Sequence, residues 1–329
     1  MTTTEDVGLE GIGDPDGERL LRDTVQRLSN RGRWGPDDEI GTLNHITPDK
    51  VVAATRLVRR GAVFSLALPF DDTGPQRGNL RRFNPMSFML RDGDDVWSRD
   101  LAGRPRGHGA SDDVVFLASQ GGTHWDALAH TFFDSTMWNG YDCRLVSSLG
   151  AERNGISTYR DKIVTRAVLV DLARSAGRDW LPPGHRITTA DLDWALEEQD
   201  VDVGAGDIVL LRFGHIAMCR ERGDWGDYAG GDAPGLAFET LDWIAHHQLA
   251  GVAADTWGVE VRPNEISYVN QPWHRVALPH LGLLVGEMFD FEELAADCAR
   301  DRVFEMLFSA CPLPVTGSVG GPINPIAVK

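Results

Sequence analysis

The chain has 329 residues, of which 42% are hydrophobic and 25% are charged, so it can bury a large core without support from disulfides. Asp and Glu outnumber Lys and Arg by 49 to 32, and this formal net charge of -17 argues against nucleic acid or an anionic membrane as a partner. Scattered cysteines without CxxC spacing, no apolar run long enough to span a membrane and no signal-peptide pattern predict a reduced, cytoplasmic, globular protein.

The chain shows no internal repeat and no linker that would divide it. Its first 17 residues have no apolar periodicity, and we expect them to form a disordered tail. No Pro/Ser-rich segment or change in composition separates the remainder. We therefore predict a single domain over residues 18–329, with a helical N-terminal extension.

Helices and strands are expected to alternate along this domain. Cap or turn residues before a helical apolar period indicate helix starts near Thr47, Thr188, Ala237 and Asp290, and Gly61 is expected to end the first of these helices. Apolar runs of strand length lie at residues 62–68, 87–90, 114–118, 167–172, 208–212, 251–254, 281–285 and 303–310. This alternation predicts a mixed α/β domain.

Residues 119–130, with the sequence SQGGTHWDALAH, follow an apolar strand and carry three titratable side chains. His124 and Asp126 are two residues apart in a turn or an extended segment, where alternate side chains point the same way and can bind one divalent ion. A helical turn after Asp126 would place His130 one turn behind that ion, in position to move protons. The alternative is a tight glycine turn, a helix cap at Asp126, and two histidines with structural hydrogen bonds.

A second group of polar residues lies downstream. His274 precedes the apolar run 281–285 and Glu287 follows it. A carboxylate at the end of a buried strand must be solvated, paired or bound to a metal. These two residues could complete a site begun by His124 and Asp126. The alternative is a histidine at the rim and a carboxylate beside a helix.

Four further residues are candidates for substrate contacts. Asp255 and His215 each follow an apolar strand, where side chains often face a cleft. Trp125 and Trp138 flank the histidine motif and could form walls for a planar substrate. The chain has no GxSxG elbow, Walker loop or GxGxxG after a strand, which argues against serine hydrolase, nucleotide and dinucleotide functions.

The segment Gln120-x-Gly-Thr-His124-x-Asp126-x-x-x-His130 resembles the HxGTHxDxPxH signature of the metal-dependent cyclase family. This family includes bacterial kynurenine formamidase, isatin hydrolase and trans-dienelactone hydrolase. Residues 34–44 and 313–325 look like the terminal segments of its longer bacterial members, so the resemblance spans nearly the whole chain. It implies an α/β fold around a partly open β-barrel, surrounded by helices, and assembly into a homodimer or homotetramer.

The resemblance also implies a role for each residue of the two polar groups. His124 and Asp126 would be metal ligands, and His130 would be the catalytic acid and base. His274 and Glu287 would form a more distant pair of ligands, able to bind a second ion.

Two positions depart from the family signature. Gln120 stands in the place of the first ligand histidine, and Leu128 stands where the signature has proline. The amide oxygen of Gln120 can coordinate an ion, but it is a weaker donor than imidazole and favours harder metals. We therefore expect a divalent cofactor, either Mn²⁺ or a loosely held Zn²⁺.

These features favour a metal-dependent hydrolase that opens a small cyclic or aryl amide or a lactone. A metal-activated water would attack the carbonyl while His130 acts as acid and base. A metal-assisted dehydratase or cyclase acting on a carbonyl substrate is the second interpretation. A metal-poor binding protein or pseudoenzyme, suggested by Gln120, is the third. A small molecule is the expected partner in each case.

Overall fold

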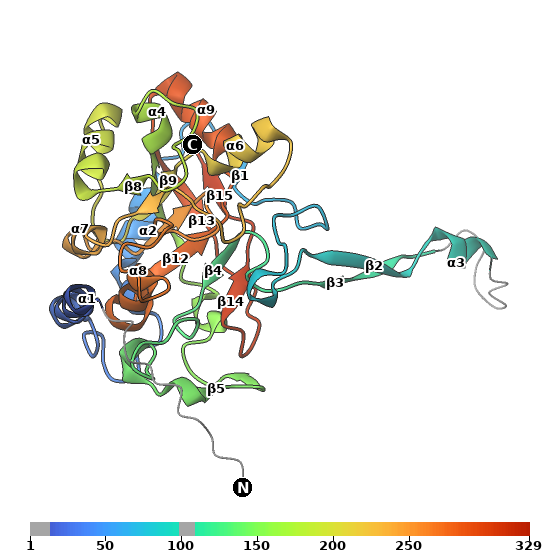
Figure 1. Ribbon diagram of the computed structural model, residues 1–329. Helices are drawn as coiled ribbons and strands as arrows, with labels where there is room; N and C mark the ends of the chain where they lie inside the picture. Colours follow the sequence, from blue (N-terminus) through green and yellow to red (C-terminus); the bar gives the residue numbers. More distant parts are fainter. Residues whose placement is uncertain (1–13, 99–108) are drawn as a thin grey trace, which may run out of the picture.

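A nine-stranded mixed sheet forms the centre of the molecule in the computed structural model, which describes residues 14–98 and 109–329 (Figure 1). The sheet curls into a partly open barrel with helices around it, which confirms the expected α/β class. Its strands lie in the order β1 (Val63–Ser65), β15 (Ile326–Val328), β13 (Glu305–Ser309), β7 (Val164–Asp171), β9 (Ile208–Arg212), β11 (Gly251–Ala254), β12 (Leu284–Glu287), β4 (His124–Asp126) and β14 (Gly320–Pro322).

The middle of the sheet is parallel, and its edges are antiparallel. Strands β7, β9, β11 and β12 run parallel, and β9 and β11 are buried along their whole length. Such strands need apolar side chains on both faces, which explains why their sequences are continuous apolar runs. The short strand β4 pairs antiparallel with β12 on one side and β14 on the other. The histidine motif therefore lies within the sheet.

The remaining elements surround this sheet. None of the described helices is long and apolar enough to cross a bilayer. The helices are α1 (Pro15–Leu28), α2 (Pro48–Thr55), α3 (Gly93–Ser98), α4 (Leu172–Ser175), α5 (Thr189–Gln199), α6 (His215–Arg222), α7 (Thr240–His246), α8 (Pro272–Val276) and α9 (Glu292–Asp301). Three small two-stranded sheets pair β2 (Met86–Arg91) with β3 (Asp112–Phe116), β5 (Val146–Ser147) with β6 (Gly150–Ala151), and β8 (Arg186–Ile187) with β10 (Gly235–Leu236).

Several expected elements agree with the structure. Strands β9 and β11 have the expected bounds. Helix α5 begins with the expected capping box, in which the Thr188 hydroxyl accepts a hydrogen bond from the Asp191 backbone N–H and the Asp191 carboxylate accepts one from the Thr188 backbone N–H. Both signals are local in sequence, so neighbouring residues alone can specify them.

Other boundaries were wrong. Helix α1 begins at Pro15 with Asp14 as its cap, so the expected tail is too long by the first turn of a helix, and residues 1–13 lie outside the described part of the chain. Helix α2 ends at Thr55, well before Gly61. The apolar run expected as strand 281–285 begins instead as the end of a π-helical turn, Ala277–Leu281, and the strand starts at Leu284. Apolar content alone did not distinguish the two.

Strands β2 and β3 form a ribbon that extends away from the body, with α3 near its outer end (Figure 1). The ribbon lies outside the central sheet. It was expected as two strands at residues 87–90 and 114–118, but the sequence did not indicate that they would project into solvent. We call β2 and β3 together the arm.

Gly286 on β12 lies directly opposite Trp125 on β4. A Cβ at this position would lie 2.3 Å from Cζ3 of the Trp125 indole. We expect Gly286→Ala to displace the indole and lower the free energy of unfolding by about 1–3 kcal/mol, the usual cost of overpacking a core. Gly204→Ala is the control, because a Cβ there meets no atom within 4 Å. Equal urea midpoints for the two variants would contradict the expectation.

Candidate metal centre

His124 and Asp126 on β4 and Glu287 on β12 bring their ligand atoms together on one face of the sheet. The antiparallel register sets Glu287 opposite His124, and alternate residues of β4 point the same way. His124 Nε2 lies 3.3 Å from Asp126 Oδ1 and 3.5 Å from Glu287 Oε2. All three side chains are buried. The ligand atoms lie within 4.8 Å of one another, so the group could hold one ion.

The hydrogen bonds of this group leave ligand atoms free. His124 Nδ1 contacts the Gly122 carbonyl at 2.9 Å, which places the proton on Nδ1 and leaves the Nε2 lone pair open. His124 Nε2 and Asp126 Oδ1 have no hydrogen-bond partner among the described residues. Two ligands at about 2.1 Å from a tetrahedral ion are roughly 3.4 Å apart, close to the observed separations. One nitrogen and two carboxylates therefore fit a divalent cation.

The neighbouring imidazoles favour the ionised form of Asp126. Burial opposes ionisation, but the neighbouring imidazoles of His130 and His124 outweigh that effect and hold the pKa of Asp126 well below its usual range. A buried carboxylate of this kind is available as a metal ligand without first losing a proton.

His130 lies at the edge of the group. Its Nε2 is 3.7 Å from Asp126 Oδ1, and its Nδ1 is 3.4 Å from the Gln120 side-chain amide. Residues 127–130 form a turn closed by a hydrogen bond from the His130 N–H to the Ala127 carbonyl at 2.8 Å, and not the helix that we had considered. About 25% of the His130 side chain is exposed, so it can reach both a buried ion and a substrate.

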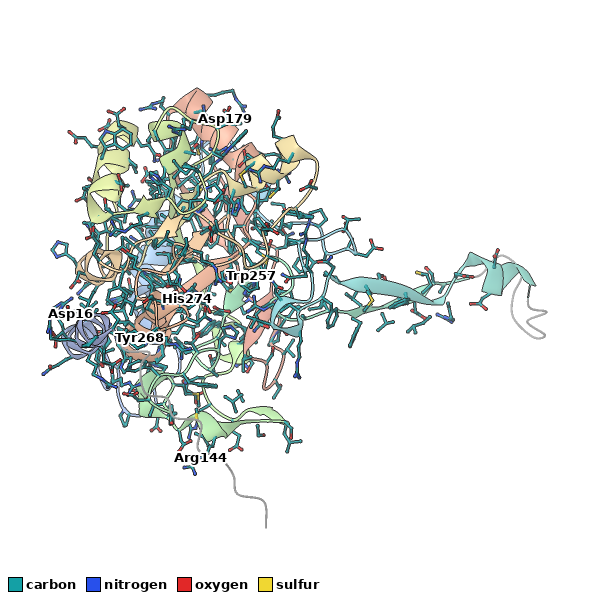
Figure 2. The ribbon with its side chains drawn as sticks, viewed as in Figure 1. Asp16, Arg144, Asp179, Trp257, Tyr268 and His274 are labelled. Atoms are coloured by element: carbon teal, nitrogen blue, oxygen red, sulfur yellow. The ribbon has the colours of Figure 1, made fainter. Side chains whose placement is uncertain are left out.

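His274, on α8, lies behind Glu287. Its Nε2 is 3.0 Å from Glu287 Oε1, and its Nδ1 is 2.5 Å from Glu260 Oε1. Burial disfavours the charged ring, but hydrogen bonds to the two carboxylates outweigh burial and raise the pKa of His274 to about 10. Both ring nitrogens are thus engaged by carboxylates, and the ring fixes the orientation of Glu287. His274, labelled in Figure 2, is buried within the body of the molecule.

The two tryptophans proposed as substrate walls are core residues. Trp125 alternates with His124 and Asp126 along β4 and so points to the opposite face, where its Nε1–H donates to the Ala310 carbonyl at 2.8 Å. The Trp138 Nε1–H donates to Asp38 at 3.0 Å. Both indoles have 0% exposure, which leaves no surface for a substrate.

Asp255 and His215 also differ from our expectation of substrate contacts. The Asp255 carboxylate accepts hydrogen bonds from the backbone N–H groups of residues 213, 214 and 215, and burial raises its pKa to about 7. It therefore shapes the turn that begins α6. His215 lines a cavity of about 490 Å³ together with Arg222, Trp225 and Tyr228. None of the ligand candidates His124, Asp126 or Glu287 lines this cavity.

Sequence reasoning missed three residues near the centre. The Glu260 carboxylate forms a hydrogen bond with the His274 ring. Its position between two buried valines could have suggested a paired carboxylate. A Cβ on Gly258 would lie 3.9 Å from Glu287 Oε1, so this backbone borders the group. Arg82 stacks over the Trp257 ring at 4.9 Å, and no local sequence signal connects it to residues 175 positions away.

The sequence matches a known family over most of its length. A family model described as "Putative cyclase" matches residues 44–261. The chain belongs to the cyclase family. This confirms the resemblance seen in the motif around His124. A search of curated protein sequences finds no significant match.

Several solved structures share this fold. A crystal structure described as a novel cyclase has 37% sequence identity and a TM-score of 0.84, covering 92% of this chain and 100% of its own. Isatin hydrolase A from Ralstonia solanacearum has 17% identity and a TM-score of 0.59, covering 86% and 98%. Isatin hydrolase A from Labrenzia aggregata, bound to benzyl benzoate, has 16% identity and a TM-score of 0.56, covering 85% and 97%.

We expect His124→Ala to abolish tight binding of Mn²⁺ or Zn²⁺, because it removes the nitrogen ligand from the centre of the group. Titration calorimetry on chelator-treated protein measures this directly. His185→Ala is the control, because His185 is exposed and lies outside β4 and β12, the strands that carry the three ligand candidates. Unchanged metal affinity in His124→Ala would show that the ion, if any, is held elsewhere.

Proposed function

We propose that this protein is a metal-dependent hydrolase that opens a small cyclic or aryl amide or a lactone. The observation that carries the proposal is the buried group of His124, Asp126 and Glu287, in which His124 Nε2 and Asp126 Oδ1 have no partner among the described residues. Leaving such atoms unpaired is costly in a core, so their arrangement is explained by a ligand.

The proposed ligands are His124, Asp126 and Glu287, with the Gln120 amide oxygen at the margin and His274 as the residue that orients Glu287. A divalent ion in this place supplies Lewis acidity, which strengthens water as a nucleophile at neutral pH and polarises a carbonyl. We propose Mn²⁺ or Zn²⁺, and the oxygen-rich set favours the harder Mn²⁺.

His130 is the proposed acid and base. Its Nε2 faces Asp126, and its Nδ1 faces the Gln120 amide. Burial lowers the pKa of His130, so the ring is neutral near pH 7 and has a nitrogen free to accept a proton. An amide offers both an oxygen and an NH₂ group, so Gln120 can pair with Nδ1 whether or not that nitrogen carries a proton. The same ring can then return the proton to the leaving group.

The relatives support the class of reaction. Three of the structures similar to this chain are named isatin hydrolases, and isatin is a cyclic aryl amide. Their identity to this chain is low, so they favour the bond type without specifying the substrate.

A dehydratase or cyclase is the second candidate, and the description of the matching family as a cyclase favours it. The same residues would then stabilise an enolate, and His130 would move a proton on carbon. The mass of the product separates the two reactions, because hydrolysis adds one water to the substrate. Metal analysis of protein purified without chelator separates both from a metal-poor binding protein.

We expect His130→Ala to lower kcat by about 10²–10⁴-fold, the usual worth of general acid–base catalysis, while the metal content stays near that of the wild type. A screen of formyl-anilides, isatin and unsaturated lactones with added Mn²⁺ or Zn²⁺ identifies the assay substrate. His185→Ala serves again as the control. Loss of the metal from folded His130→Ala protein would instead make His130 a ligand.

A further inference from the structure

The cavity of about 490 Å³ that His215 borders is lined by α6 and by the glycine-rich loop that follows this helix, residues 223–235. His215, Met218 and Arg222 contribute from α6, where spacings of three and seven residues place them on one face of the helix. The volume lies within the range of small-molecule sites in proteins, about 300–1,000 Å³. None of the proposed metal ligands lines this cavity, so it is a second pocket of the molecule.

Three aromatic rings form a row along this cavity. The ring centroid of Tyr228 lies 4.9 Å from that of His215 and 5.2 Å from that of Trp225. The Tyr228 hydroxyl donates to the Asp255 carbonyl at 3.0 Å. The Trp225 Nε1–H donates to the Thr73 carbonyl at 2.7 Å. Because the polar ends of both side chains are engaged elsewhere, their rings offer apolar surface, which suits a flat aromatic ligand.

Hydrogen bonds hold the loop in the shape that lines the cavity. The Gly231 N–H donates to the Asp227 carbonyl at 2.8 Å, and the Tyr228 N–H donates to the Trp225 carbonyl at 2.9 Å. A Cβ on Gly231 would lie 2.4 Å from the Asp227 carbonyl oxygen, so this turn needs glycine. The wall is therefore formed in advance, which lowers the entropic cost of binding a ligand.

Two polar side chains of the lining have unused hydrogen-bonding capacity. His215 is 2% exposed, and its Nδ1 has no hydrogen-bond partner among the described residues. Burial, with a smaller effect of the Arg222 charge, lowers the pKa of His215 to about 4, so the ring is neutral near pH 7. The Arg222 guanidinium takes part in no ion pair or hydrogen bond within residues 14–98 and 109–329. An unpaired buried nitrogen and an unpaired cation in one lining indicate a ligand with a negatively charged polar group.

We propose that this cavity binds a small aromatic carboxylate, with its ring against Trp225 and Tyr228 and its carboxylate on Arg222. A guanidinium offers parallel N–H donors that match the two oxygens of a carboxylate. Two aspartates also line the cavity, but both are exposed, and Asp227 faces Arg77 at 3.6 Å. Arg222 would contact the ligand directly, whereas the charges of the aspartates act through solvent and are screened.

The ligand class includes the products of the proposed reaction. Hydrolysis of a cyclic aryl amide or lactone adds one water across the C–N or C–O bond and leaves a carboxylate on the aromatic product. This link rests on the proposed function. The binding of an aromatic carboxylate does not rest on it, because none of the proposed metal ligands lines the cavity.

Equilibrium dialysis of 2-naphthoate against the full chain, without added metal, tests the proposal. We expect Arg222→Gln to weaken 2-naphthoate binding by about 10-fold or more, the usual worth of a hydrogen bond to a charged group. Binding of the neutral 2-naphthylmethanol should stay within about twofold, because it makes no charged contact. Arg59→Gln is the control, because Arg59 is exposed and does not line the cavity. His124→Ala should bind 2-naphthoate as the wild type does.

Trp225→Leu tests the aromatic wall. We expect it to weaken the binding of both 2-naphthoate and 2-naphthylmethanol by about threefold or more, because stacking does not depend on the charge of the ligand. Trp194→Leu on α5 is the matched control, because Trp194 is 41% exposed and lies outside the lining of the cavity.

Equal 2-naphthoate affinity in wild-type and Arg222→Gln protein, or no binding by the wild type, would overturn the proposal. Loss of binding in His124→Ala would also overturn it, because the ligand would then lie at the metal centre. Tighter binding of 2-naphthylmethylamine than of 2-naphthoate would make the aspartates the determinants and reject an anionic ligand. Failure of the proposed function would appear separately, as a protein that binds 2-naphthoate through Arg222 but hydrolyses none of the screened amides and lactones.

Discussion

Three residues of β4 pair with β12 on one side and β14 on the other, and the metal centre depends on this register. It sets His124 opposite Glu287. Trp125 lies between His124 and Asp126 in the strand, so the same register directs its indole to the opposite face, into the core. A slip of one residue would exchange the faces, burying the ligands among apolar side chains and exposing the indole. The absence of a side chain on Gly286 makes room for that indole, so packing on one face of β4 holds the chemistry on the other.

The charged groups of this site are buried, and burial of each charge is costly unless a neighbouring group offsets that cost. His274 lies between Glu260 and Glu287, and the positive ring offsets the cost of burying two carboxylates. His124 Nε2 and Asp126 Oδ1, which face each other, have no hydrogen-bond partner among the described residues. A divalent cation would complete the balance. The arrangement of these residues therefore suits a divalent ion.

Membership of the cyclase family accounts for the sheet and the position of the motif. Two further residues near the motif bear on its chemistry. Gln120 stands where the signature that the motif resembles has its first histidine, and its amide contacts His130. Arg82 adds a positive charge to the same rim. Arg82 lies four residues before β2, and Gln120 lies four residues after β3. Short stretches of chain therefore connect the arm to the site. Fold alone would not reveal this connection.

The sequence by itself determined features that depend on near neighbours. The capping box of α5, the strands β9 and β11, and the spacing of His124 and Asp126 follow from residues a few positions apart. Only the tertiary structure placed Glu287 opposite His124, Glu260 against His274 and Arg82 against Trp257, and only it buried Trp138 completely. These contacts join segments that the sheet register and the packing of the core bring together. Local patterns predict conformation along the chain, whereas long-range contacts depend on how the whole chain closes on itself.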